Sequence, residues 1–205
     1  MNNKTLSIKN IVEAVLLVAS KPMTIRQMML LFDEQERPSE KLLRDALVEL
    51  QRESMTRSIE LKEVAGGFRL QTKQDYVPWL KKLFAERPPR YSRALLETLV
   101  LIAYRQPVTR AEIEAIRGVA VSSQIIKTLV EREWIKVVGH RDVPGKPSLL
   151  GTTKSFLDYF NLKSLDQLPN LEEPEDPMVT DVQTTVVDTL FKAVKKDTHK
   201  KIAVE

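Results

Sequence analysis

Residues 95–118 read LLETLVLIAYRQPVTRAEIEAIRG. Apolar residues recur at helical spacing in the first half, which predicts a helix with one apolar stripe containing Leu95, Leu96, Leu99, Ile102 and Ala103. Pro107 should end this helix, because the residue before a proline is pushed out of the helical region. Thr109 and Glu112 match a capping box at the start of a second helix, and Gly118 is suited to close it as a left-handed C-cap. The segment is therefore predicted to be two helices joined by a sharp turn.

The same arrangement recurs 85 positions earlier in the chain. Thr24 and Gln27 form a second capping box, flanked by the apolar pair Met23 and Met28. Each helix pair is followed by a third helix, two strands around a turn and a short closing helix. The third helices are predicted at 39–53 and 122–133, the strands at 58–64, 68–73, 135–139 and 148–151, the turns at Gly66-Gly67 and Pro144-Gly145, and the closing helices at 75–84 and 155–160.

This repeat predicts an α+β, mainly α fold with two tandem winged-helix domains, residues 1–86 and 91–169. Residues 87–90 form a proline-containing linker, and residues 170–205 a partly disordered C-terminal tail. The tail starts with an acidic, proline-broken tether and continues with an amphipathic stripe that includes Leu190 and Phe191. Its β-branched residues predict a marginal helix that forms when the stripe docks on a partner or on the dimer. A dispensable tail and a single strand are the alternatives.

Composition argues against an enzyme and predicts no cofactor. The chain has no cysteine, which excludes disulfides and thiolate sites and is compatible with the cytoplasm. Only His140 and His199 are histidines, too few for a histidine-rich metal centre, and no phosphate-binding glycine loop occurs. Glu13 interrupts the apolar run near the N-terminus, so we expect a domain's first helix there rather than a signal peptide. No run approaches membrane-spanning length, so no membrane partner is expected.

Charge is distributed unevenly along the chain. Basic residues exceed acidic ones by 3 in residues 1–87 and by 4 in 88–160, while acidic residues exceed basic ones by 3 in 161–205. Neither predicted third helix has a positive surplus, which disfavours major-groove binding. The second wing carries Lys136, Arg141 and Lys146, which predicts non-specific DNA contact at most; a solvated hairpin is the alternative. A winged-helix transcription regulator is the second reading, from fold alone.

Residues 90–119 and 145–169 resemble bacterial segregation and condensation protein B. The most distinctive pieces are Tyr104-Arg105-Gln106-Pro107 and Ile116-Arg117-Gly118-Val119. The resemblance implies a non-enzymatic homodimer that binds a kleisin subunit, segregation and condensation protein A. Through the kleisin it implies association with an SMC ATPase in chromosome condensation and segregation, in the cytoplasm at the nucleoid.

The internal repeat suggests a dimer interface in the first domain. The 85-residue offset aligns Met28 and Leu31 with the second domain's Ile113 and Ile116, the expected core pairs; it aligns Met29 and Phe32 with Glu114 and Arg117. Because charges in the second domain replace large apolar groups in the first, Met29 and Phe32 are predicted to lie exposed and to contact a second copy. A wider core in the first domain is the alternative.

The partner-binding surface of the second domain is predicted on its first two helices, at Tyr104, Arg105, Arg110 and Arg117. These residues lie on or near the turn, outside the predicted core. Tyrosine and arginine are the side chains that most often anchor protein interfaces. Ordinary solubility, with Tyr104 partly buried under the wing, is the alternative.

Overall fold

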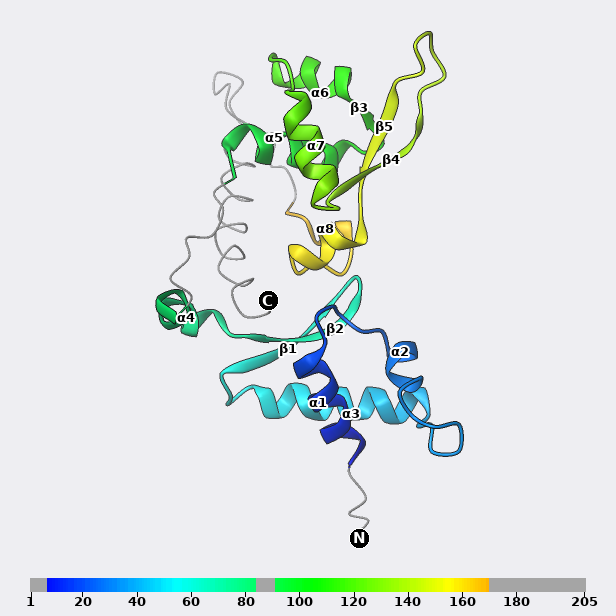
Figure 1. The fold of residues 1–205 in the computed structure, drawn as a ribbon, viewed down its shortest axis with the longest axis vertical. Helices are drawn as coiled ribbons and strands as arrows, with labels where there is room; N and C mark the ends of the chain where they lie inside the picture. The colour runs from blue at the N-terminus through cyan, green and yellow to red at the C-terminus, as the bar shows by residue number, and fades with distance from the viewer. Residues whose placement is uncertain (1–6, 84–90, 170–205) are drawn as a thin grey trace. The chain divides into compact units, whose positions relative to one another are not determined.

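The computed structural model describes residues 7–83 and 91–169 of the chain. They form two compact units, coloured blue to cyan and green to gold in Figure 1. The predicted α+β fold with two tandem winged-helix domains is confirmed. The predicted linker and tail, residues 87–90 and 170–205, lie outside the described residues. Within residues 7–83 and 91–169, no helix combines the length and apolarity needed to cross a bilayer.

The N-terminal unit has three helices, a hairpin and a short closing helix. Its elements are α1 (Ile8–Val18), α2 (Ile25–Met29), α3 (Glu40–Ser54), β1 (Ile59–Val64), β2 (Gly67–Thr72), the 3-10 turn η1 (Gln74–Tyr76) and α4 (Val77–Leu83). Helix α2 begins with the predicted capping box. The Gln27 N–H donates to the Thr24 hydroxyl at 3.2 Å, and the Thr24 N–H donates to Gln27 Oε1 at 2.8 Å.

The hairpin turn lies one position earlier than predicted. Val64 pairs with Gly67, so Ala65 and Gly66 form the turn and Gly67 already belongs to β2. Met23 and Phe68 exchange backbone hydrogen bonds of 2.9 and 2.8 Å, which joins the loop before α2 to the wing. Gly67 has φ +123°, and a Cβ atom there would lie 2.2 Å from the Met23 carbonyl oxygen. Glycine is required at position 67 because the backbone there lies so close to the Met23 carbonyl, and not because the turn needs it.

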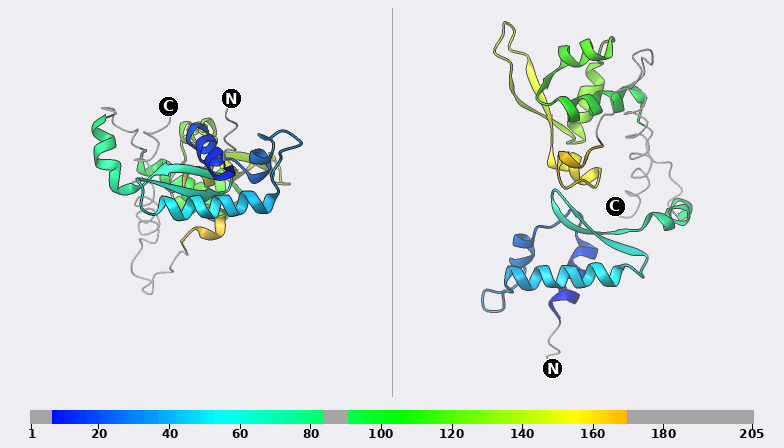
Figure 2. Two further views of the ribbon diagram at one scale, coloured as in Figure 1. Left: turned by 90° about the horizontal axis from the view of Figure 1, so that it is seen from below. Right: turned by 180° about the vertical axis from the view of Figure 1, so that it is seen from behind.

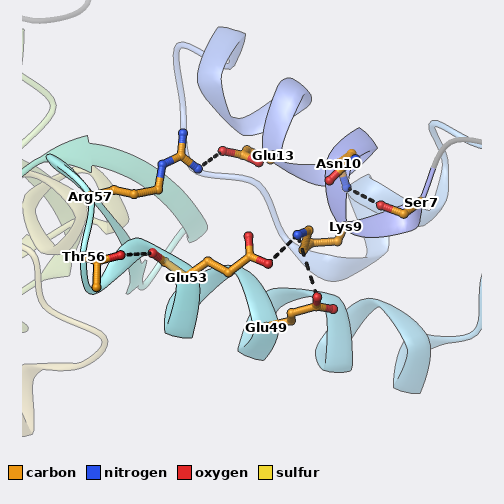
Figure 3. A network of polar contacts seen from close by, with 8 residues as sticks. All are labelled: Ser7, Lys9, Asn10, Glu13, Glu49, Glu53, Thr56 and Arg57. Atoms are coloured by element: carbon orange, nitrogen blue, oxygen red, sulfur yellow. Dashed lines mark hydrogen bonds and ion pairs between the residues drawn. The ribbon is translucent and has the colours of Figure 1, made fainter.

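Helix α1 is held on α3 by apolar packing and by ion pairs at its edges. The buried side chains are Val12, Leu16, Met28, Leu43, Leu47, Leu50 and Leu61. Lys9 Nζ lies 2.6 Å from a Glu53 oxygen and 3.7 Å from Glu49, and Arg57 donates to the Glu13 carboxylate (Figure 3). The hydrogen bond from Lys9 lowers the pKa of Glu53.

The C-terminal unit repeats this order with one additional strand. Its elements are α5 (Arg93–Arg105), β3 (Val108–Thr109), α6 (Arg110–Arg117), α7 (Ser123–Glu131), β4 (Ile135–His140), β5 (Ser148–Thr152), α8 (Lys154–Tyr159) and the 3-10 turn η2 (Leu165–Gln167). The sheet order is β3–β5–β4, with Val108 opposite Leu150. The sequence did not predict β3, because two residues are too few to show an alternating pattern. Gly118 closes α6 with φ +69°, as predicted.

The core of the C-terminal unit lies between α5, α6, α7 and the sheet. Ile102, Ile113 and Leu129 are completely buried at its centre. An aromatic cluster borders it, in which the Trp134 ring lies 4.6 Å from Tyr159 and 5.6 Å from Phe160. This apolar framework fixes α5 and α6, the two helices that carry the predicted binding residues.

The second member of each predicted core pair is exposed. Met28 and Ile113 are buried, but Leu31 is 53 % and Ile116 43 % exposed, so that part of the prediction is wrong. Helix α2 ends at Met29, which places Leu31 beyond it. In α6 the residue four positions after Ile113, Arg117, continues the inward face instead of Ile116, three positions after it.

Candidate partner-binding surfaces

Two of the predicted binding residues lie at the C-terminal end of α5. Arg105, the last residue of the helix, is exposed. Tyr104 is half-buried against the core, and its hydroxyl donates to the Pro169 carbonyl at 2.6 Å. Burial raises the pKa of this hydroxyl. Tyr104 therefore fastens Pro169 to the end of α5. Arg105 is the side chain that the end of α5 exposes to solvent.

The two predicted arginines of α6 are occupied within the unit. Arg110 donates to the Val121 carbonyl, to Ser123 Oγ at 3.0 Å and to Glu114 at 3.0 Å, so it ties down the α6–α7 loop. The Arg117 side chain is only 6 % exposed, and its Nη2 donates to Glu97 on α5 at 3.0 Å. The expectation that Arg117 lies exposed is wrong, because it continues the buried face of α6.

A groove of about 640 Å³ lies beside Arg110, between α6, α7 and the wing. Its apolar wall is formed by Ala111, Ile126, Pro147 and Leu150, and Arg110 and Lys127 also line it. Lys127 is 67 % exposed and only loosely paired with Glu131, at 3.7 Å. Glu114 lines the groove too and pairs with Arg110, so Lys127 is the positive side chain that the groove offers a partner. An apolar wall beside one exposed lysine suits an extended peptide with apolar residues and an acidic one. Sequence reasoning missed the groove because its walls come from three separate elements, and periodicity does not show which elements meet.

The wing carries less unpaired positive charge than its sequence suggests. Lys136 and Lys146 are exposed, as a DNA-contacting role would require. Arg141, however, donates to the carboxylate of Glu112 on α6, so its charge is already paired. DNA contact by these three residues stays a prediction, with Lys136 and Lys146 as its stronger members.

Glu112 makes the stability of this unit depend on pH. The Thr109 N–H, which donates to Glu112 at 2.8 Å, lowers the pKa of the carboxyl, and Arg141 lowers it further. A lowered folded-state pKa adds stability above the unfolded value of about 4.3, and this stability is lost as pH falls through the folded value. Glu112→Gln keeps an acceptor for Thr109 but cannot titrate. We expect its urea midpoint to lie below that of the parent at pH 7 and to approach it as the pH is lowered toward 3.

The control for this prediction is Glu131→Gln, at an exposed carboxylate 3.7 Å from Lys127. Exposed pairs of this kind contribute little, so its midpoint should follow that of the parent chain at every pH. A Glu112→Gln variant whose midpoint difference from the parent is the same at pH 7 and pH 3 would contradict the assignment.

The predicted dimer residues of the N-terminal unit are not exposed in the way the prediction assumed. Met29 and Phe32 are half-buried and pack against the core around Met28. Phe32 takes the inward position that Arg117 occupies in the repeat, which matches the wider-core alternative. The exposed apolar residues in this region are Leu30, at 63 %, and Leu31. A dimer contact through Met29 and Phe32 remains untested.

The largest exposed aromatic side chain lies on α4, an element to which the sequence analysis assigned no role. Trp79 is 67 %, Leu83 73 % and Tyr76 43 % exposed. Their spacing of three and four residues, visible in the sequence, could have identified an apolar stripe. In both views of Figure 2, α4 lies at the far end of the hairpin from α2. We call Tyr76, the last residue of η1, together with Trp79 and Leu83 of α4 the α4 stripe.

Two further predictions concern the tail and bound ions. Leu190 and Phe191 lie outside the described residues, so their proposed contacts remain predictions. Among residues 7–83 and 91–169, no group of three or more His, Cys, Asp or Glu side chains is arranged to hold a metal ion.

Comparison with known proteins identifies the family. The model of the family described as "Segregation and condensation complex subunit ScpB" matches residues 10–171. The chain belongs to this family. A relative from Coxiella burnetii, named segregation and condensation protein B homolog, is 56% identical over 168 residues, which are 82% of this chain and 80% of the relative.

Two solved structures are also similar. ScpB from Mycobacterium tuberculosis is 34% identical and matches 73% of this chain and 92% of its own, with a TM-score of 0.34. A dimer of the ScpB N-terminal domain complexed with ScpA peptide is 31% identical and matches 41% of this chain and 91% of its own, with a TM-score of 0.32. The resemblance seen in the sequence is thus confirmed by the sequence match to the ScpB family, and the α4 stripe, the groove and the wing all lie inside the matched residues.

Proposed function

We propose that this chain is a non-enzymatic, homodimeric accessory subunit of a bacterial SMC–kleisin complex that condenses and segregates chromosomes. The observation that carries the proposal is the ScpB family match over residues 10–171, which spans both winged-helix units. In the proposed complex the dimer binds the kleisin ScpA, a peptide of which accompanies the solved ScpB N-terminal domain, and reaches the SMC ATPase through it. Its place is the cytoplasm, at the nucleoid.

The roles of the carboxylates support a non-enzymatic subunit. Glu112 caps α6 and pairs with Arg141, and Glu114 accepts from Arg110 and from the Val121 N–H at 2.9 Å. The hydrogen bond from the Val121 N–H, and after it the one from Arg110, lowers the pKa of Glu114. Carboxylates held ionised by structural partners are poor proton donors near neutral pH, so these two residues act as caps and loop anchors rather than as general acids.

The third helices support a scaffold over a transcription regulator. Arg44 on α3 lies 2.6 Å from Glu40, and Lys127 on α7 lies 3.7 Å from Glu131. A helix that lies along DNA needs a surplus of positive charge, and these pairs reduce it further. We assign non-specific contact with the DNA backbone to the exposed wing residues Lys136 and Lys146.

We assign kleisin binding by the C-terminal unit to two places, the groove and the exposed Arg105 at the end of α5. The experiment is titration of the full chain with the middle segment of a kleisin, with stoichiometry measured by light scattering and affinity by calorimetry. Arg105→Ala and Lys127→Glu are each expected to weaken binding by roughly tenfold, the effect of losing an interface contact of about 1.4 kcal/mol. Both side chains are exposed, so the fold should be unaffected.

Lys154→Ala on α8 is the matched control, because this exposed lysine does not line the groove. Unchanged affinity in both test variants would remove this surface from the proposal. Absence of any kleisin binding by the parent chain would contradict the proposed function itself.

A further inference from the structure

Helix α4 is anchored to the N-terminal unit on one side only. Val77 is buried and Leu80 half-buried, whereas the α4 stripe faces solvent. Among the described elements, α4 packs extensively only against η1, which directly precedes it. A tryptophan and a leucine exposed on such a helix leave a large apolar area in water, which is typical of a surface that is covered in the assembled protein.

Helical geometry places the stripe on one narrow face. Tyr76 is the last residue of η1, and α4 continues directly from it. At 100° per residue from Tyr76, Trp79 and Leu83 fall within about 60° of it. Asp75, one 3-10 step of about 120° before Tyr76, falls on the same flank as Lys82, beside Trp79, and both are exposed. The face therefore has an apolar centre and, along one edge, an acid near its start and a base near its end.

We propose that α4 pairs antiparallel with α4 of a second copy of this chain, with the two stripes in contact across a two-fold axis. The inference rests on the homodimer in the proposed function and gives that dimer its interface. A two-fold interface uses the same patch on both copies, so the patch must be complementary to itself.

The charges on the flank satisfy this requirement in one orientation only. In an antiparallel pair that crosses near Trp79, Asp75 of each copy lies opposite Lys82 of the other, which gives two attractive pairs. In a parallel pair Lys82 would lie opposite Lys82 of the second copy, and like charges repel. A kleisin peptide has no need for this two-fold arrangement of an acid and a base, so the charges favour a second copy as the occupant.

The exposed area indicates how far the interface extends. With aromatic side chains covering 150–250 Å² each, the exposed part of the stripe offers roughly 400 Å². A standard interface needs about 800 Å² per partner. The stripe is therefore the apolar centre of the interface, and polar surface of the N-terminal unit around it has to supply the remaining area.

The test is sedimentation equilibrium of the full chain and its variants. Trp79→Glu and Leu83→Glu are each expected to raise the dimer dissociation constant at least 100-fold with an unchanged circular dichroism spectrum, because both side chains are exposed within one unit. Val48→Glu is the matched control, because Val48 is 66 % exposed and lies on α3. This variant should dimerise like the parent chain. Tryptophan fluorescence gives a second readout, because Trp134 is buried and Trp79 should shift to longer wavelength when the dimer is diluted.

Charge reversal tests the orientation. Asp75→Lys and Lys82→Asp should each weaken the dimer by placing like charges opposite one another, and the double variant should restore it. A dimeric parent chain with a dimeric Trp79→Glu variant would overturn the α4 interface while leaving the homodimer intact. A double variant as weak as the single ones would overturn the antiparallel orientation. If removal of residues 170–205 changes the Trp79 fluorescence spectrum while the oligomeric state stays the same, the tail covers the stripe instead. A monomeric parent chain would contradict the homodimer of the proposed function.

Discussion

Gly67→Ala is expected to destabilise the N-terminal unit by more than about 3 kcal/mol. Two effects combine at this position. The backbone has φ +123°, which side chains rarely adopt, and the new Cβ would lie 2.2 Å from the Met23 carbonyl oxygen. To relieve the contact, the wing must move away from the loop before α2, which breaks the Met23–Phe68 hydrogen bonds. Hydrogen exchange followed by mass spectrometry measures this loss separately in β2 and in α5.

Gly118→Ala is the matched control for this substitution. Gly118 also has a positive φ, +69°, but no atom lies within 4 Å of its added Cβ. The variant should therefore lose only the cost of a left-handed backbone, about 1 kcal/mol. Equal losses in the two variants would mean that the backbone conformation, and not the contact with Met23, determines the effect.

Removing Glu97 is expected to cost the C-terminal unit about 2–4 kcal/mol, because the loss leaves the Arg117 guanidinium buried without its carboxylate. Glu97 is 19 % exposed and accepts from Arg93 at 2.9 Å as well as from Arg117. The variant Glu97→Ala should therefore have a clearly lower urea midpoint than the parent chain. The double variant Glu97→Ala with Arg117→Met should recover part of the loss, because no charge is then left buried.

The exposed pair Lys127 and Glu131 provides the comparison for this cycle. Its two side chains are 67 % and 57 % exposed, so Glu131→Ala should cost less than about 0.5 kcal/mol. If Glu97→Ala were equally mild, Arg117 would not depend on its partner, and its predicted role as a partner-binding residue would regain support.

Part of the candidate surface could be predicted from sequence. Arg105 is exposed as expected, because it follows directly from where Pro107 ends the helix. Arg110 and Arg117 have the residue type of interface anchors, but their partners, the α6–α7 loop and Glu97, are set by packing between helices. Periodicity does not reveal such partners, since it reports only which face of a helix is apolar.

The sequence by itself determined the repeated winged-helix fold and the caps of α2 and α6. Capping boxes at Thr24 and Thr109 and the C-cap at Gly118 depend on residues within one helical turn, so local chemistry is sufficient to place them. Tertiary structure alone decided which large side chains are covered. Phe32 turned inward, Trp79 remained exposed, and the groove formed where α6, α7 and the wing meet. Exposure depends on which other elements pack against a side chain, and no local pattern contains that information.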